Sequence, residues 1–566
     1  MVRLLLSCAS WRWAVGQWAV GQWAVGQWAV GRCVLCVLVL GTVPIASSAQ
    51  RFLADDPLWE DPDRLDMPFP ERRATNSRIG PLEFLRRSFA VPGRYTTPAQ
   101  NKNTVGGVPN SSWYTNRHYR FGSTRAALRT GPNEEPAPSL QAQWRVTGVV
   151  SRGDLPRLVI RDATDRRFQL LFDAPAHPEM ATGAAMISSR LLHAVGYNVP
   201  QHWLRRIQPR RLAATPQDGP DSSTIDSVLA RAAQRSDGTY RTLVTRIPHV
   251  ARRLGPFRFQ ETRPDDANDV FPHQHRRELR GLRVVAAWIH HSKLRPRHTL
   301  DVGVRKDGRR FVRHYLRDLH RTLGSAGARP KSAWSGHEHV LEVGRVVERI
   351  GTLGLSGGEW ADEASLGAPA VGRFGAESFA PRQWRPEWPN SAFQHARPAD
   401  AFWAAKKICA FSRADLQAIV ATAQYSSPAV RRHMVQALMD RRDAIGTAYL
   451  GWGGGLGRFQ VERGRLTFAD LWARYGGAPD TLRRTVTWRV FDNQADTLSP
   501  VLHRTATAHE AVPIVDYSAP YVRATLRTST AGATHVFLRW DGTEGTRRRR
   551  VVGVERQGGK RAASAP

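Results

Sequence analysis

Alternating apolar and polar positions predict antiparallel strands between residues 143 and 173. The runs WRVTGVV, RLVIRD and RFQLLFD place an apolar side chain at nearly every second residue, and the turn-forming segments SRGDLP and ATDR separate them. This spacing makes one face of a strand apolar. A helical period follows over 181–196, and Gly196 ends it. A further strand over 202–207 completes a small mixed lobe.

A second helical period covers residues 275–291, where one stripe of the helix carries Leu279, Leu282, Ala286 and Ile289. A basic loop follows this helix, and then a strand that brings one carboxylate, Asp318, next to a turn. The stretch 324–398 is rich in Gly, Ala and Pro, so we expect mostly loop there, with a helical piece over 339–350.

Two further helices and a group of strands complete the pattern. Ser412 and Asp415 form a capping box at the start of one helix, and Pro428 opens the next. The glycine run GWGGGLG at 451–457 ends the helical region and is expected to be a flexible hinge. Regularly spaced strand-like runs over 485–556 predict a β-sandwich.

These elements predict the α+β class, with an extended N-terminal arm, a two-lobed core and a small C-terminal β-sandwich-like domain. The expected boundaries are 1–49 for a signal peptide with a WAVGQ repeat, 50–138 for the arm, 139–250 for an α+β lobe, 251–455 for a mostly helical lobe and 456–566 for the β-domain. In the arm we expect Trp113 and Tyr114 to be buried anchors, together with Trp59, Phe69 and Phe84.

The first 49 residues have the features of a secretory signal. Arg32 precedes an apolar run, 33–46, that is too short to span a bilayer, and small residues follow before Gln50. The chain is therefore expected to be exported to the periplasm or beyond, with no transmembrane helix in the mature part. The upstream WAVGQ repeat has a period of five, which fits neither helix nor strand. Three of the four cysteines lie in this segment, so Cys409 alone would remain.

Composition indicates a folded protein with a strong basic excess. Hydrophobic residues make up 41% of the 566 residues and charged residues 23%, which excludes wholesale disorder. The net charge is +33, yet only seven of the 82 basic residues are lysines, and the arginines are spread along the whole chain. A dispersed distribution argues against a dedicated nucleic-acid surface. We expect affinity for anionic envelope surfaces instead. Lys406 and Lys407 are expected on a solvated helix face.

Five segments carry a resemblance to a known group of proteins: VPNSSWYTNR, FDAPAHPEMATGAAMISSRLLHAVGYNVP, PHQHRRELRGLRVVAAWIHH, HYLRDLHRTLGS, and FSRADLQAIVATAQY with its continuation MDRRDAIG. They resemble a family of uncharacterised exported bacterial proteins, which in turn is similar to atypical kinases of the persistence-toxin and spore-coat types. The resemblance implies a kinase-like two-lobed core.

The resemblance also implies where an active site would lie and what it has lost. The phosphate-binding lysine falls on Leu171 and its glutamate partner on Ala185. The catalytic aspartate and the metal-binding asparagine fall on Lys293 and His298. Only the metal-binding aspartate before the turn is retained, as Asp318. Phosphoryl transfer needs a cation on the phosphates, ligands for magnesium and a base for the hydroxyl. The expected site therefore lacks most of its chemistry.

Three interpretations follow from these substitutions. The first is an exported pseudokinase-like binding or scaffold module without phosphotransfer. The second is an active atypical kinase, or another metal-dependent transferase, in which Asp318 and His298 hold the metal and Mg-ATP is the cofactor. The third is a decaying gene product without a present role. Asp318 also has a structural alternative, as a cap of the following turn. His273 and His275, like His337 and His339, stand two apart in turn-rich loops, where we expect exposed histidines.

Overall fold

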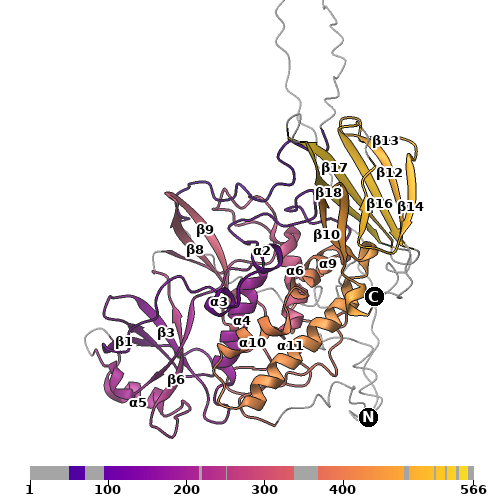
Figure 1. The fold of residues 1–566 in the computed structure, drawn as a ribbon. Coiled ribbons are helices and arrows are strands. Elements are labelled where there is room, and N and C mark those ends of the chain that lie inside the picture. Colours follow the sequence, from indigo (N-terminus) through magenta and orange to yellow (C-terminus); the bar gives the residue numbers. More distant parts are fainter. Residues whose placement is uncertain are drawn as a thin grey trace, which may run out of the picture. The chain divides into compact units, whose positions relative to one another are not determined.

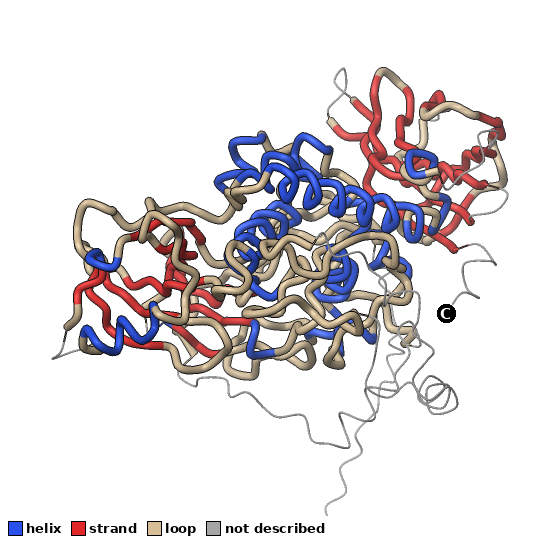
Figure 2. The backbone as a smooth tube through the Cα atoms, turned by 90° about the horizontal axis from the view of Figure 1, so that it is seen from below, coloured by secondary structure: helices blue, strands red, loops and turns tan. Residues whose placement is uncertain are grey.

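The computed structural model describes residues 50–70, 95–215, 219–249, 252–336, 367–476, 484–515, 518–528, 532–542 and 547–558 (Figure 1). These residues all belong to one unit, 50–566. The signal segment, Phe84, the helical piece expected at 339–350, and His337 with His339 lie outside the described residues. Helices and strands gather in separate groups (Figure 2), so the fold class is α+β, as predicted.

The strands predicted over 143–173 and 202–207 belong to a six-stranded sheet in the order β4-β6-β3-β2-β1-β5. Its strands are β1 (Trp144–Val149), β2 (Arg157–Arg161), β3 (Arg167–Phe172), β4 (His202–Ile207), β5 (Leu212–Ala213) and β6 (Tyr240–Arg246). All neighbours are antiparallel except β1 and β5. Helix α5 (Ser222–Leu229) packs its apolar side chains into the core beneath this sheet.

Helix α4 (Met180–Val195) connects this sheet to the rest of the molecule. Asp173, directly after β3, accepts hydrogen bonds from the backbone amides of Ala181 and Thr182 at 2.9 Å each. This carboxylate fixes the start of the helix because it satisfies amides that have no partner within the helix. Every side chain of α4 except His193 is buried, so the helix is a central element of the largest hydrophobic core.

The helical part contains α6 (Arg277–Trp288), α8 (Ser391–Gln394), α9 (Pro398–Ile408), α10 (Arg413–Ala421) and α11 (Pro428–Tyr449). Ser412 and Asp415 form the predicted capping box of α10. The indole of Trp288 donates to the carbonyl of Leu438 at 2.9 Å, which ties α6 to α11. After α6, a hairpin of β8 (Thr299–Lys306) and β9 (Arg309–Leu316) pairs with the short β7 (Arg253–Gly255). The sequence predicted a single strand where this hairpin lies.

The C-terminal strands form two sheets that share one apolar core. The smaller sheet contains β10 (Leu456–Glu462), β11 (Arg465–Asp470) and β15 (Ala511–Pro513). The larger contains β12 (Arg484–Asp492), β13 (Thr497–Leu498), β14 (His503–Thr507), β16 (Tyr521–Thr528), β17 (Gly532–Asp541) and β18 (Arg548–Gly558). The glycine run expected to be a hinge packs against this domain, because Thr534 donates to the carbonyl of Gly453.

The N-terminal arm is irregular apart from two short helices, α2 (His118–Phe121) and α3 (Arg125–Thr130). Phe52 enters the core of the β-domain beside Phe491 and Phe537. Trp113 and Tyr114 are buried in the core, as predicted. The arm therefore contributes side chains to distant parts of the unit rather than forming a core of its own.

Candidate functional site

A cavity of about 230 Å³ lies between the first sheet, α4 and the β8–β9 hairpin. It brings together three of the five positions singled out in the sequence. Leu171 comes from β3, Ala185 from α4, and Asp318 from the turn after β9. These residues are far apart in the sequence and converge because the sheet, the helix and the hairpin surround one space.

Two of these side chains supply only apolar surface. Leu171 is 3% exposed and Ala185 1% exposed, and both belong to the main hydrophobic core. Neither can hold a phosphate by charge or by a side-chain hydrogen bond. The wall formed by β3 and α4 is therefore suited to an apolar part of a ligand.

Asp318 has a left-handed backbone, with φ 60° and ψ 39°, and precedes the short 3-10 helix η5 (Leu319–Arg321). Its side chain makes no capping hydrogen bond to that helix, so the alternative role as a turn cap is wrong. The carboxylate lies 3.8 Å from the guanidinium of Arg317 and is 31% exposed. A non-glycine residue in this backbone region is uncommon, and aspartate is one of the residues that adopt it most readily, as Asp165 and Asp307 also do.

Lys293 and His298 do not line the cavity. The ammonium of Lys293 pairs with the carboxylate of Glu387 at 3.2 Å. His298 is buried, and burial together with Arg297 and Arg295 lowers its pKa to about 3. Its carbonyl accepts a hydrogen bond from the amide of Arg317 at 2.9 Å, which places the loop beside the Asp318 turn.

The described residues contain no group of three or more His, Cys, Asp or Glu side chains that could hold a metal ion. Arginine surrounds His298, and a cationic neighbour disfavours a divalent metal. The sequence-based assignment of Asp318 and His298 as metal ligands thus lacks the further ligands that a metal site needs.

The remaining lining of the cavity is strongly basic. Among the described residues of the lining, the arginines are Arg117, Arg246, Arg253, Arg313 and Arg317, and the carboxylates are Glu134 and Asp318. Burial lowers the pKa of Arg117 to about 10, with Arg313 adding to the effect, so this guanidinium is still charged at neutral pH. The lining therefore carries more positive than negative charge, which favours an anionic ligand.

Three histidines also line the cavity and are neutral. Burial lowers the pKa of His193, His202 and His320 to about 3 each, and nearby arginines add to this effect. A neutral imidazole has one donor and one acceptor nitrogen. These rings can orient a polar ligand without adding charge.

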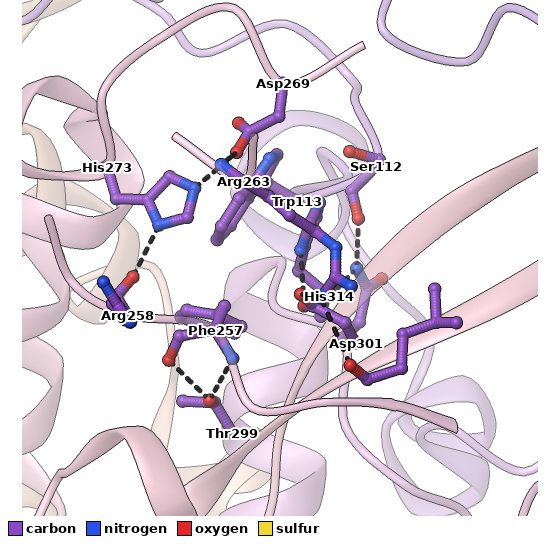
Figure 3. A network of polar contacts seen from close by, with 12 residues as sticks. Ser112, Trp113, Phe257, Arg258, Arg263, Asp269, His273, Thr299, Asp301 and His314 are labelled. Atoms are coloured by element: carbon purple, nitrogen blue, oxygen red, sulfur yellow. Dashed lines mark hydrogen bonds and ion pairs between the residues drawn. The ribbon is translucent and has the colours of Figure 1, made fainter. Parts of the chain in front are cut away.

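A buried polar network holds the hairpin that carries Asp318 (Figure 3). His314 of β9 contacts Asp301 of β8 at 2.7 Å, and Arg263 donates to the same carboxylate at 3.0 Å. The ring of Trp113 stacks on His314 with centroids 3.6 Å apart. The amide of Asn198 donates to the carbonyls of Ser112 and His314. Because Asn198 also lines the cavity, the arm and the hairpin fix the shape of the site together.

The same network corrects the expectation that His273 is exposed. Its ring is 2% exposed and lies 2.6 Å from the carboxylate of Asp269. Burial alone would raise the pKa of Asp269, but His273 and Arg276 hold it below its usual value. Asp269 is four residues before His273, a spacing that pairs side chains within a helix, but residues 269–272 are not helical, so the pair could not be predicted from a period.

Lys407 is also buried, so the prediction that it lies on a solvated helix face is wrong. Its ammonium donates to Asn116 at 3.2 Å and lies 4.7 Å from the ring centroid of Tyr119 and 5.4 Å from that of Trp403. Aromatic faces attract a cation, which compensates part of the desolvation. Trp403 lies on the same helix, but Asn116 and Tyr119 come from the arm, so sequence period alone could not reveal this environment.

Comparison with family models, with curated proteins and with solved structures finds no match to this chain. Within the described ranges, every helix is too short or too polar to cross a membrane.

Proposed function

We propose that this chain is an exported bacterial protein whose kinase-like core binds a small anionic ligand without transferring a phosphoryl group. The observation that carries the proposal is the composition of the first cavity. Apolar side chains stand at Leu171 and Ala185, arginines surround them, and the carboxylate of Asp318 is the only acid on the turn after the hairpin. Such a lining attracts an anion but offers few ligands for magnesium.

The site also lacks a base at the position that the resemblance implies. Lys293 is a cation and pairs with Glu387. A hydroxyl nucleophile in phosphoryl transfer gives up a proton, and a protonated lysine cannot accept it. These features favour binding over catalysis.

The test is a thermal-shift series, because a ligand that binds only the native state raises the melting temperature. Inorganic phosphate and citrate serve as anion probes at matched ionic strength. We expect both to raise the melting temperature, and Arg313→Gln to reduce the shift. Lys306→Gln, on the exposed end of the hairpin, is the matched control. Equal shifts in wild type and Arg313→Gln would contradict the proposed site.

The second candidate is an active kinase or another metal-dependent transferase centred on Asp318. The position of this carboxylate in the cavity favours it. The second candidate predicts that ATP raises the melting temperature only when Mg²⁺, Mn²⁺ or Zn²⁺ is present. It also predicts that Asp318→Ala removes this increase. The binding proposal predicts no metal-dependent shift with ATP and no transfer of labelled phosphate.

The proposal of export rests on the sequence of the first 49 residues. It predicts that the full-length chain, expressed in a bacterial host, is recovered from the periplasm or medium with Gln50 as its first residue. N-terminal sequencing of the recovered protein checks this. The basic excess further predicts sedimentation with vesicles that contain anionic lipid, weakened by salt.

A further inference from the structure

A second, larger cavity of about 450 Å³ lies where the arm, α9 and β18 meet. The arm contributes Arg51 and Lys102, α9 contributes Phe402 and Lys406, and β18 contributes Arg556. This volume is in the range typical of sites for small molecules. The first cavity shares none of these residues.

The charge of the second cavity is unbalanced. Its cationic side chains are Arg51, Lys102, Arg277, Arg397, Lys406 and Arg556, and its carboxylates are Asp400 and Glu555. Both carboxylates already have partners, because Arg277 pairs with Asp400 at 3.1 Å and Arg51 pairs with Glu555. Within the described part of the chain, no carboxylate lies within ion-pair distance of the other four cations, Lys102, Arg397, Lys406 and Arg556.

Two of the four cations without a carboxylate partner, Arg556 and Lys406, lie close to an aromatic ring. The guanidinium of Arg556 lies 4.7 Å from the ring centroid of Phe402, and the ammonium of Lys406 lies 5.9 Å from the same centroid. Phe402 and Trp452, both in the lining, have ring centroids 6.0 Å apart. The rings fix the cations in place and offer an apolar surface beside them.

Gly453 explains how Arg556 reaches this position. The residue has φ 63°, and a Cβ there would lie 2.6 Å from the Cβ of Arg556. Only glycine leaves room for the arginine stem at this turn. The glycine run after α11 therefore shapes one wall of the cavity.

Burial and like charges act together on Lys406. They lower its pKa well below the usual value, with burial as the largest cause and Arg556, Lys407 and Arg277 as further causes. Lys407, by contrast, has a hydrogen-bond acceptor in Asn116. An anion in the cavity would relieve the repulsion on Lys406 and favour its charged form.

We propose that this second cavity binds a small molecule that carries two or more phosphate groups. Four cations without carboxylate partners match the charge of such a ligand, and the guanidinium groups of Arg397 and Arg556 suit phosphate oxygens. The aromatic wall contacts the rest of the ligand. The phosphates could belong to a soluble molecule or to a lipid headgroup, and the chemistry that recognises them is the same.

The test measures binding of pyrophosphate by titration calorimetry on the mature chain, with Lys406→Gln, Arg556→Gln and Lys102→Gln as variants. We expect each variant to weaken binding about tenfold, as the loss of one charge-assisted contact predicts. Lys306→Gln is a matched control at an exposed lysine outside both cavities and should bind like wild type. Lys102 is exposed, so Lys102→Gln keeps the test informative if another variant fails to fold.

Two further experiments distinguish a soluble ligand from a lipid headgroup, and the second cavity from the first. The first is a sedimentation assay in which vesicles that contain phosphatidylglycerol replace pyrophosphate. If Lys406→Gln abolishes binding to the vesicles but does not change binding of pyrophosphate, the ligand is a lipid headgroup. Pyrophosphate is also a small anion, so the first cavity contributes a binding event of its own under the proposed function. Arg313→Gln should weaken only that event and leave the event that Lys406→Gln weakens unchanged, so failure of the proposed function remains distinguishable. The inference is overturned if wild type binds neither probe, or if Lys406→Gln, Lys102→Gln and Lys306→Gln bind alike.

Discussion

The guanidinium of Arg157 lies 3.1 Å from the ring nitrogen Nε2 of His320. Arg157 stands opposite Leu171 in the β2–β3 ladder, and residues that face each other in a ladder point to the same side of the sheet. His320 is two residues beyond Asp318. The resemblance implies a lysine at Leu171 on β3, paired with a glutamate at Ala185. In the structure a cation, Arg157, reaches the Asp318 turn from the neighbouring strand β2. It contacts the neutral imidazole of His320.

Replacing Arg157 by leucine should destabilise the fold. The change removes the partner of a buried ring nitrogen, and an unsatisfied buried polar group costs about 1 to 3 kcal/mol. Urea denaturation of Arg157→Leu measures this loss. The control is Arg145→Leu, whose side chain is 54% exposed and pairs with Asp165 on the surface. Such surface pairs contribute about 1 kcal/mol or less. Equal losses in the two variants would refute a structural role for the Arg157 contact.

Acid should weaken the protein through its buried histidines. The pKa of His202, His298 and His320 is lowered to about 3 in each case, from an ordinary value near 6.5, and burial is the largest cause. Between these values the unfolded chain binds more protons than the folded chain, so stability rises with pH and falls as pH drops below 6.5. Each histidine contributes up to about 1.4 kcal/mol per pH unit in this window.

Urea midpoints measured from about pH 7 down to about pH 5 check this dependence. His202→Gln removes one of the groups with a lowered pKa and should make the midpoint less sensitive to pH. His503→Gln, at an exposed position of β14, is the control and should leave the dependence as in wild type. A midpoint that does not move over this range would contradict the role of these histidines.

The elements that the sequence predicts well are those in which apolar residues recur at the spacing of a strand or a helix. The strands at 144–172, the helix α4 and the capping box of α10 follow from alternation, from the helical period and from local capping. The convergence of five positions on one cavity was expected from the resemblance and not from any period, and three of them, Leu171, Ala185 and Asp318, line the cavity.

Pairs between distant segments could not be read from the sequence. Asp301 and His314 face each other across a hairpin that looked like one strand, and Trp113 joins them from the irregular arm. The arginines that line the two cavities could not be singled out in the sequence, because arginine is spread evenly along the chain. A residue type that is abundant everywhere gives no local signal, so only the fold separates the arginines that line a cavity from the rest.

Removing Asp301 should be among the most damaging single changes in the hairpin. Its carboxylate is fully buried and accepts from Arg263 and contacts His314. Asp301→Ala removes one of the carboxylates that Arg263 contacts, while Asp265 remains, and it removes the carboxylate beside the buried ring of His314. Loss of such a buried hydrogen-bond partner costs about 1 to 3 kcal/mol. Thermal and urea denaturation measure the loss. Asp541→Ala removes a carboxylate that is 46% exposed and pairs with Arg550, so it should cost less than about 1 kcal/mol.

Gly183 should tolerate no side chain, because α4 packs closely against the segment that follows α10. A Cβ at Gly183 would lie 2.5 Å from the hydroxyl of Tyr425 and 2.6 Å from two of its ring carbons. Tyr425 is itself 3% exposed, so its ring has little space to move away. Overpacking of this kind costs about 1 to 3 kcal/mol, which exceeds the gain of less than about 1 kcal/mol that alanine brings to a helix.

Gly183→Ala should therefore lower the free energy of unfolding, as measured by urea denaturation. Gly148→Ala in β1 is the matched control, because the nearest heavy atom to its Cβ lies 4.0 Å away, which is an ordinary contact distance. The same methyl group is then added once in a crowded interface and once at an ordinary contact distance. Because α4 carries Ala185 and His193 into the first cavity, Gly183→Ala should also reduce the melting-temperature increase with phosphate, whereas Gly148→Ala should preserve it. A stable Gly183→Ala protein with unchanged anion binding would show that the contact between α4 and Tyr425 does not hold the site.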